Sequence, residues 1–168
     1  MKEAGKDTKK LRTLSQVEIA ALLPQAPPFL LVDRVTELEP GRRGKGIRNV
    51  TANDVHMLGQ FPGRPIMPGV LIVESCGQLA ALVCATEEPE SPASSGGDQA
   101  FTPKKDGEKL SILAMIERFK FLRLVSPGDQ MILEAEIGKR FQDMIRIIVS
   151  ARVGSHLVAE GVLLATKG

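Results

Sequence analysis

The hydrophobic pattern along the chain predicts one short helix, one long buried helix and a set of strands. Ser15 and Glu18 have the spacing of a capping box, and the helix that they open is expected to run to Leu23. Residues 70–85, VLIVESCGQLAALVCA, are apolar on nearly every side of a helix, which is typical of a helix buried inside a protein. This second helix is the expected centre of the core.

Strands are expected on both sides of the long helix. Before it, apolar runs and alternating stretches cover residues 29–32, 35–39 and 46–50. After it, five more strands are predicted at residues 110–116, 118–125, 131–137, 144–153 and 156–165. Turn signals lie at residues 40–41, 127–129, 138–139 and 154–155. Together these elements predict an α+β fold in which a curved antiparallel sheet wraps around one central helix.

The composition predicts a single domain with two segments that do not belong to its core. Residues 1–13 are rich in charge and are expected to form a flexible tail, whereas residues 14–168 form the domain. Residues 86–109 are rich in Pro, Gly, Ser and charge, and they are expected to form a flexible insertion after the long helix. That insertion acts either as a functional flap or as a tolerated excursion.

Charge and hydropathy exclude several classes of function. The 22 basic and 20 acidic residues leave a net charge of +2, too balanced for a dedicated nucleic-acid binder. Trp and Tyr are absent, so stacking platforms for single-stranded nucleic acid are not expected. No apolar run is long enough to span a membrane, and no apolar region of a secretory signal follows the basic N-terminus. A soluble, cytoplasmic protein is therefore expected.

Cysteine and histidine are too few and too scattered for a metal centre or a disulfide. Cys76 and Cys84 fall in the same predicted helix, which separates their Cα atoms by about 12 Å, beyond disulfide reach. His56 and His156 are the two histidines, and they form no cluster with the cysteines. We therefore expect neither a metal nor another cofactor.

A carboxylate in the buried helix is the first candidate for chemistry. Glu74 lies about one turn past the helix start, between Val73 and Ser75, where an unpaired charge is costly. It is either a structural side chain, paired or at a subunit interface, or a catalytic one. The backbone N–H groups of Gly69 and Val70 at the helix start could polarise a carbonyl oxygen, or could simply be hydrated.

Three long motifs resemble those of a known enzyme family. APPFLLVDRV, then GQFPGRPIMPGVLIVE, then RFKFLRLVSPGDQMILEAEI are similar to the beta-hydroxyacyl-acyl-carrier-protein dehydratases of fatty-acid synthesis, the FabZ type. The resemblance implies a hot-dog fold, a dimer with two composite active sites, and often a trimer of dimers. It also implies a substrate, a (3R)-hydroxyacyl chain on the phosphopantetheine arm of acyl carrier protein from fatty-acid or polyketide synthesis.

The catalytic pair of that family is only half matched. The family uses a Glu, which corresponds to Glu74, and a His from the other subunit in a Gly-His-Phe-Pro motif. Gln60 occupies the His position. Dehydration needs a base for the proton alpha to the thioester and an acid for the hydroxyl, and an amide does not titrate. Gln60 can only hydrogen-bond a thioester or a water, so the resemblance implies a dehydratase with an impaired site.

The resemblance also indicates residues around that pair. Phe61 and the backbone N–H groups of Gly69 and Val70 are expected to contact the thioester. A second departure lies at Gln25 and Ala26, where the family commonly has His-Arg. Basic side chains could steer an acidic carrier protein, although each could equally be an ordinary solvated charge. The four placed at the carrier-protein surface are Arg64, Arg118, Lys120 and Arg123, and the others considered are Arg42, Arg43, Lys45 and Arg48.

Three functions remain open for a chain with Glu74 and Gln60. It could be a slow or adapted dehydratase, a non-catalytic subunit whose active homologue supplies a His, or an acyl thioesterase that uses the two side chains. His56 is a poor substitute for the base, since the family has an apolar residue at that position. His156 lies beside a predicted turn and is expected to be solvated.

Overall fold

The computed structural model describes residues 11–61, 63–87 and 111–167. The tail predicted at residues 1–13 lies outside this part up to residue 10, and the insertion predicted at 86–109 lies outside it from residue 88. The helices are α1 (Gln16–Leu22), the short 3-10 helix η1 (Val55–Met57) and α2 (Gly69–Ala85). The strands are β1 (Arg12–Leu14), β2 (Arg34–Glu39), β3 (Arg43–Asn49), β4 (Ser111–Phe121), β5 (Gln130–Phe141), β6 (Met144–Val153) and β7 (His156–Lys167).

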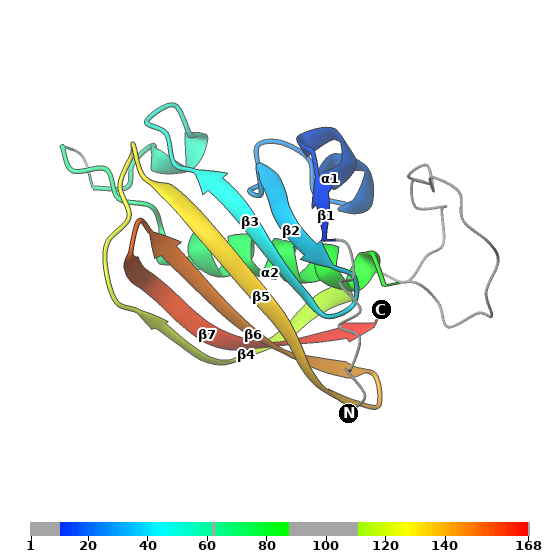
Figure 1. The fold of residues 1–168 in the computed structure, drawn as a ribbon. Helices are drawn as coiled ribbons and strands as arrows, with labels where there is room; N and C mark the ends of the chain where they lie inside the picture. The colour runs from blue at the N-terminus through cyan, green and yellow to red at the C-terminus, as the bar shows by residue number, and fades with distance from the viewer. Residues whose placement is uncertain (1–10, 62, 88–110, 168) are drawn as a thin grey trace, which may run out of the picture.

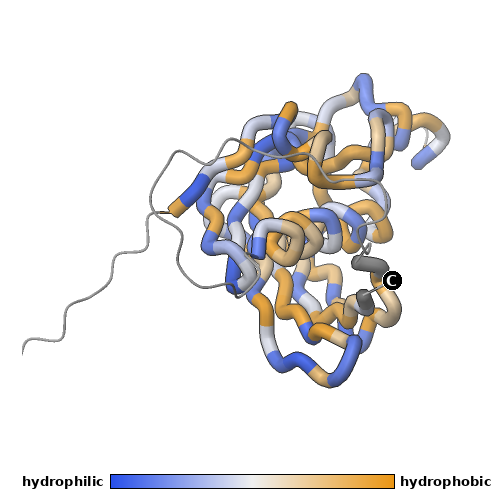
Figure 2. The backbone as a smooth tube through the Cα atoms, turned by 90° about the vertical axis from the view of Figure 1, so that its right-hand side faces the viewer, coloured by the Kyte–Doolittle hydropathy of each residue, from blue (hydrophilic) through white to orange (hydrophobic). Residues whose placement is uncertain are grey.

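The strands form one curved antiparallel sheet with α2 against its inner face (Figure 1). Their order is β1-β2-β3-β5-β6-β7-β4, so β4 pairs with β7 at one edge although β5 follows it in sequence. Figure 2 looks nearly along α2 and shows hydrophobic segments on several sides of the helix. The predicted architecture, a sheet around one buried helix, is confirmed.

The long helix is buried because its apolar side chains face the sheet and the loops that cover it. Nine of its residues are buried: Ile72, Val73, Ser75, Cys76, Gln78, Leu79, Ala80, Leu82 and Val83. Two glycines of β3 allow a close approach. A Cβ atom at Gly44 would lie 2.7 Å from Cγ2 of Val83, and one at Gly46 would lie 3.3 Å from Cδ1 of Leu79. A larger residue at position 44 would therefore push the helix away from the sheet.

The first helix begins with the predicted capping box. The Ser15 hydroxyl accepts a hydrogen bond from the Glu18 N–H, and the Glu18 carboxylate accepts one from the Ser15 N–H at 2.7 Å. The Ser15 hydroxyl also donates to the Glu18 carboxylate at 2.6 Å, and this bond, together with the one from the Ser15 N–H, holds the pKa of Glu18 below its usual range. The helix packs Ile19 and Leu22 into the core, and the segment that follows it leads to the start of β2.

Five features differ from the predictions. Residues 29–32 form no strand, although they are apolar, and the strand predicted at 46–50 is β3, which begins earlier at Arg43. The strands predicted at 110–116 and 118–125 are the single strand β4. The predicted turn at 138–139 lies inside β5, and residues 12–13 of the predicted tail belong to β1.

Irregular pairing explains the errors in β4 and β5. The register of β4 against β7 shifts between Leu113 and Met115 and again between Ile116 and Arg118. The register of β5 against β6 shifts between Ile137 and Arg140. An extra residue in a strand breaks the alternation of period two, so a β-bulge in the sequence resembles the end of a strand.

Candidate active site

Glu74 lies on the second turn of α2, half-buried, and a buried glutamine one turn further along the helix holds its carboxylate. Nε2 of Gln78 donates to Oε1 of Glu74 at 2.9 Å and to the carbonyl oxygen of Phe29 at 2.8 Å. Oε1 of Gln78 accepts from the N–H of Leu31 at 2.8 Å. The side chain of Gln78 is 1% exposed, so these three bonds are shielded from water. Gln78 therefore fixes Glu74 and the segment 29–31 relative to each other.

Sequence reasoning did not identify Gln78. A signal was present, because a glutamine in an apolar helix needs partners, and residues four apart lie on the same face. The same contacts explain why residues 29–32 form no strand. The side chain of Gln78 binds the carbonyl of Phe29 and the N–H of Leu31, which are the groups that a neighbouring strand would otherwise pair with.

A small cavity of about 60 Å³ lies beside Glu74. One wall is the face of α2 that carries Glu74, and the opposite wall comes from strands β4, β6 and β7. The lining residues are Gln25, Glu74, Gly77, Gln78, Ala80, Ala81, Cys84, Leu113, Ile147, Leu163 and Ala165. Small side chains on the helix and aliphatic ones on the strands suit a narrow apolar group next to a carboxylate.

Gln60 lies in the loop between η1 and α2 and is half-buried. The backbone on both sides of it is tightly turned, with φ of +78° at Gly59 and +53° at Phe61. A positive φ is uncommon for a residue with a bulky side chain, and Phe61 is 58% exposed. The N–H of Gln60 donates to the carbonyl of Met57 at 3.3 Å. The loop thus presents Gln60 and Phe61 near the molecular surface.

A buried ion pair anchors the beginning of this loop. Arg48, at the end of β3, pairs with Asp54, which precedes η1, and its other guanidinium nitrogen lies 3.9 Å from Asp33. The side chains of Arg48 and Asp54 are only 10% and 13% exposed. Arg48, which the sequence offered as a steering charge, is therefore a structural residue.

The start of α2 leaves two backbone N–H groups outside the hydrogen bonds of the helix. The first N–H groups that bond back to Pro68 are those of Leu71 and Ile72, so the N–H groups of Gly69 and Val70 precede the helical hydrogen bonds. Pro68 supplies no side-chain cap. A Cβ atom at Gly69 would lie 2.9 Å from the ring of Phe121, so the ring at the end of β4 lies directly against this helix terminus.

The remaining predicted residues are spread over the surface. Arg64, Arg118, Lys120 and Arg123 are all exposed, and none forms an ion pair within the part of the chain that the structure describes. His156 is exposed and starts β7. Nε2 of His56 lies 3.0 Å from the carbonyl oxygen of Pro28, and its ring packs edge-on against Phe29. His56 therefore supports the segment that Gln78 also holds.

The two halves of the expected catalytic pair are not brought together around one cavity of this protomer. Glu74 lines the small cavity, whereas Gln60, Phe61, Gly69 and Val70 are absent from the described residues that line it. Of the residues that the sequence singled out, Glu74, Gln25 and Cys84 line that cavity.

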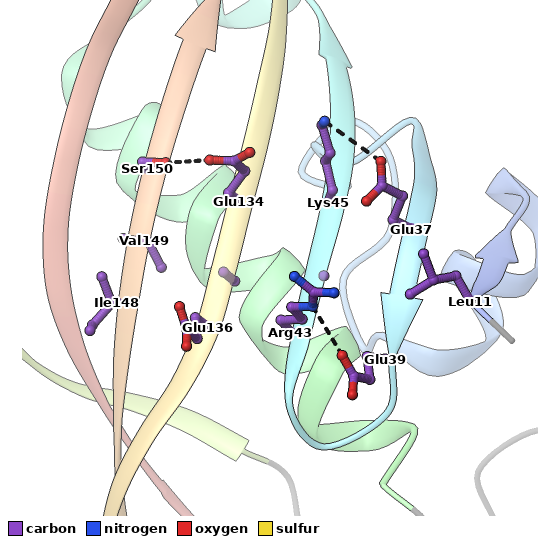
Figure 3. A pocket seen from close by; sticks show the side chains of 12 residues that line it. Leu11, Glu37, Glu39, Arg43, Lys45, Glu134, Glu136, Ile148, Val149 and Ser150 are labelled. Atoms are coloured by element: carbon purple, nitrogen blue, oxygen red, sulfur yellow. Dashed lines mark hydrogen bonds and ion pairs between the residues drawn. The ribbon is translucent and has the colours of Figure 1, made fainter. Parts of the chain in front are cut away.

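A second cavity, about 400 Å³, lies on the other face of the sheet (Figure 3). Gly44 faces α2, so its neighbours Arg43 and Lys45 point away from the helix into this cavity. Ion pairs join Arg43 to Glu39 at 3.0 Å and Lys45 to Glu37 at 3.6 Å, and Ser150 donates to Glu134. The hydrogen bond from Arg42 holds the pKa of Glu39 below its usual range. This charged groove contains none of the predicted catalytic residues.

No metal centre is found among the residues that the structure describes. Burial raises the pKa of the Cys76 thiol to about 12, so this side chain stays protonated and inert at neutral pH. No group of three or more His, Cys, Asp or Glu side chains is placed to hold a metal in residues 11–61, 63–87 and 111–167. None of the helices in those ranges is long and apolar enough to cross a membrane.

The arrangement of the sheet around α2 is the hot-dog fold. The Campylobacter jejuni protein Cj0977, described as a sigma28-regulated virulence protein, aligns with a TM-score of 0.61 over 90% of this chain and 87% of its own, at 15% identity. The dehydratase heterocomplex ApeI:P from Xenorhabdus doucetiae aligns with a TM-score of 0.55 over 78% of this chain and 93% of its own, at 14% identity. At these identities the likeness shows the fold alone.

Sequence comparison gives the family. The model of the FabA-like domain matches residues 23–162, and the chain belongs to that family. It is 40% identical over 151 residues to the 3-hydroxyacyl-[acyl-carrier-protein] dehydratase FabZ of Herpetosiphon aurantiacus, covering 90% of this chain and 96% of the relative. It is 39% identical over 150 residues to the FabZ of Alkaliphilus metalliredigens, covering 89% and 91%. The predicted family is confirmed.

Proposed function

We propose that this chain is a 3-hydroxyacyl thioester dehydratase of the FabZ type whose general base is missing. The substrate is a (3R)-hydroxyacyl chain on the phosphopantetheine arm of acyl carrier protein. One observation carries the proposal: the acid of the family pair is kept as Glu74 and held by Gln78 beside an apolar cavity, while the position of the base is Gln60. The relatives named as 3-hydroxyacyl-[acyl-carrier-protein] dehydratases support the substrate class.

The reaction is the removal of water across two carbons. A base takes the proton from the carbon alpha to the thioester, and the electron pair of that C–H bond forms the double bond to C3. The C3–O bond then breaks, and the oxygen leaves as water with a proton from Glu74. The amide of Gln60 can orient the thioester but cannot take the proton, and losing a general base costs about 10²–10⁴ in rate.

Two protomers are required for a complete site in this proposal. The separation of Gln60 from the Glu74 cavity within one protomer supports a pair of composite sites in a dimer. Strand β4 is a long edge of the sheet and exposes Leu113, Met115, Ile116 and Phe121. Long apolar edge strands need a cover, and a second copy of this chain provides one. The exposed Arg64, Arg118, Lys120 and Arg123 would then attract the acidic carrier protein.

Restoring the base tests the proposal. The variant Gln60→His should dehydrate a 3-hydroxyacyl thioester about 10²–10⁴-fold faster than the wild type, measured by the absorbance of the enoyl thioester. Adding Glu74→Gln should abolish that gain, because the two side chains act as a unit. The control Gln16→His, at an exposed position of α1, should change nothing.

Other outcomes of the same assay contradict the proposal. A wild type that already turns over at about 1–10³ per second does not lack a base. If Gln60→His does not raise the dehydration rate, the site differs from that of the family at more than this one residue. Release of free thiol by the wild type, blocked by Glu74→Gln, would instead establish the thioesterase.

A heteromeric subunit is the second candidate function. Glu74 and its support by Gln78 are intact, so this chain could complete a composite site whose His comes from a homologue. Mixing the chain with a homologue that has the Gly-His-Phe-Pro motif should then give a heterodimer by native mass spectrometry. Its dehydration rate should fall when Glu74→Gln is introduced into this chain alone.

A further inference from the structure

Gly77, in the middle of α2, faces an open space. Apart from the helix backbone and the two adjacent residues, a Cβ atom at this position would have no atom of the described chain within 4 Å. Glycine is the least favourable helix residue after proline, because it loses the most backbone freedom on folding. A Cβ atom at Gly44 would lie 2.7 Å from Val83, so packing explains that glycine but does not explain Gly77.

The open space at Gly77 belongs to the cavity beside Glu74, because both residues line it. They are three positions apart, so they lie on the same face of α2, about 5–6 Å from each other. The next residue on this face is Ala81, four positions further along, and it lines the same cavity. From the carboxylate of Glu74 as far as Ala81, this line of residues therefore carries only a hydrogen atom and a methyl group.

The strands opposite Gly77 make the space apolar. The cavity wall across from the helix is aliphatic, and its residues are Leu113, Ile147, Leu163 and Ala165. The cavity volume of about 60 Å³ corresponds to about four to six non-hydrogen atoms, since about 10–15 Å³ of such space holds one water molecule. The shape and the lining suit a short alkyl chain that continues from a group held at Glu74.

We propose that Gly77 is a specificity-determining residue, which keeps the space beside Glu74 open for the alkyl chain of a 3-hydroxyacyl group beyond C3. The inference rests on the proposed function, because that function brings C3 and its hydroxyl to Glu74. The cavity volume admits about five carbons beyond C3, which corresponds to an acyl group of about eight carbons. A larger side chain at position 77 takes the place of these carbons and leaves C3 itself accessible to Glu74.

Equilibrium binding to the full-length protein tests this assignment. The probes are (3R)-3-hydroxybutanoyl-pantetheine amide and its octanoyl counterpart; an amide in place of the thioester makes the alpha proton less acidic and suppresses turnover. The wild type should bind the octanoyl probe about tenfold more tightly or better by calorimetry, because each buried methylene adds to the affinity. Gly77→Leu should bring that ratio close to one. The control Ala20→Leu, at an exposed position of α1, should keep the wild-type ratio.

A smaller substitution distinguishes a ligand from a second copy of the chain as the occupant of the space. Gly77→Ala adds one methyl group that has no atom of the described chain within 4 Å beyond its own helix. It should therefore raise the midpoint of thermal unfolding by about 2–4 °C, and it should lower the preference for the octanoyl probe. A lower midpoint, or a dimer that dissociates in light scattering, shows that a second copy packs there and overturns the inference.

The binding data separate the inference from the proposed function. An unchanged ratio in a folded Gly77→Leu variant, or equal affinity of the wild type for the two probes, overturns the assignment to Gly77 and leaves the proposed function standing. An equal loss of affinity for both probes also overturns it, because the new side chain then blocks Glu74 instead of the alkyl chain. Failure of the wild type to bind either probe overturns the proposed function, and the inference with it.

Discussion

At the scale of single residues, Gln78 links the carboxylate of Glu74 to the backbone of residues 29–31. Its side chain is almost completely buried and binds Glu74, Phe29 and Leu31 at once. Neutral hydrogen bonds contribute modestly to stability, but a buried group that loses its partner costs about 1–3 kcal/mol. Any residue at position 78 that cannot both donate and accept should therefore disturb the stability of the protein and the position of Glu74.

The variant Gln78→Met should lower the free energy of unfolding by about 2–4 kcal/mol, because the N–H of Leu31 and the carbonyl of Phe29 both lose a partner. Gln78→Glu places a second carboxylate beside Glu74. Its instability should be largest at neutral pH and should diminish in acid, where the carboxylates become protonated. Urea unfolding at several pH values measures both effects, with Gln16→Met as the control. Wild-type stability of Gln78→Met would show that these bonds contribute nothing.

At the scale of elements, the loop that carries Gln60 depends on the end of β3. Arg48 and Asp54 are both largely buried, so each needs the other to compensate its charge. The loop is also held by the N–H of Met67, which donates to the carbonyl of Val125. The loop that presents Gln60 is thus fixed at its two ends by contacts far from the reacting groups.

Removing the Arg48 side chain should loosen that loop. Arg48→Met leaves the Asp54 carboxylate buried without its partner, and the expected loss of stability is about 3–5 kcal/mol. The double variant Arg48→Met/Asp54→Leu should recover most of the loss. Hydrogen exchange in residues 55–61 should rise in the single variant, whereas Arg34→Met, at an exposed residue of β2, should behave as wild type. Equal exchange in Arg48→Met and wild type would contradict the anchoring role.

At the scale of the whole molecule, β4 forms one edge of the sheet, and the proposed dimer interface lies along it. The sheet ends at β4 on one side, and this strand carries several exposed apolar side chains. A dimer formed there would cover them and would bring the start of α2, against which Phe121 packs, close to the interface.

A charge on this edge should therefore separate the protomers. Met115→Asp is expected to give a monomer by light scattering after size-exclusion chromatography, while Val17→Asp on the exposed side of α1 should leave a dimer. Introduced together with Gln60→His, Met115→Asp should also remove the gained dehydration, since a monomer cannot join Gln60 of one copy to Glu74 of the other. A dimer that survives Met115→Asp places the interface elsewhere.

The sequence by itself determined the elements whose signals are local. The capping box at Ser15 and the apolar run of α2 predicted both helices closely, because a helix satisfies its hydrogen bonds within its own segment. The strands β6 and β7 were found for a related reason, since regular alternation identifies a half-buried strand. The motifs around Gln60 and Glu74 predicted the family, and the match to the model of the FabA-like domain confirms it.

Only the tertiary structure decided the features that depend on distant partners. The continuation of β4 and β5 through their bulges is fixed by pairing with β7 and β6. The irregular path of residues 29–32 follows from hydrogen bonds to a side chain nearly fifty positions away, at Gln78. The open space at Gly77 became visible only when helix and strands enclosed one cavity, because the distance to a neighbouring element is a property of the assembled fold.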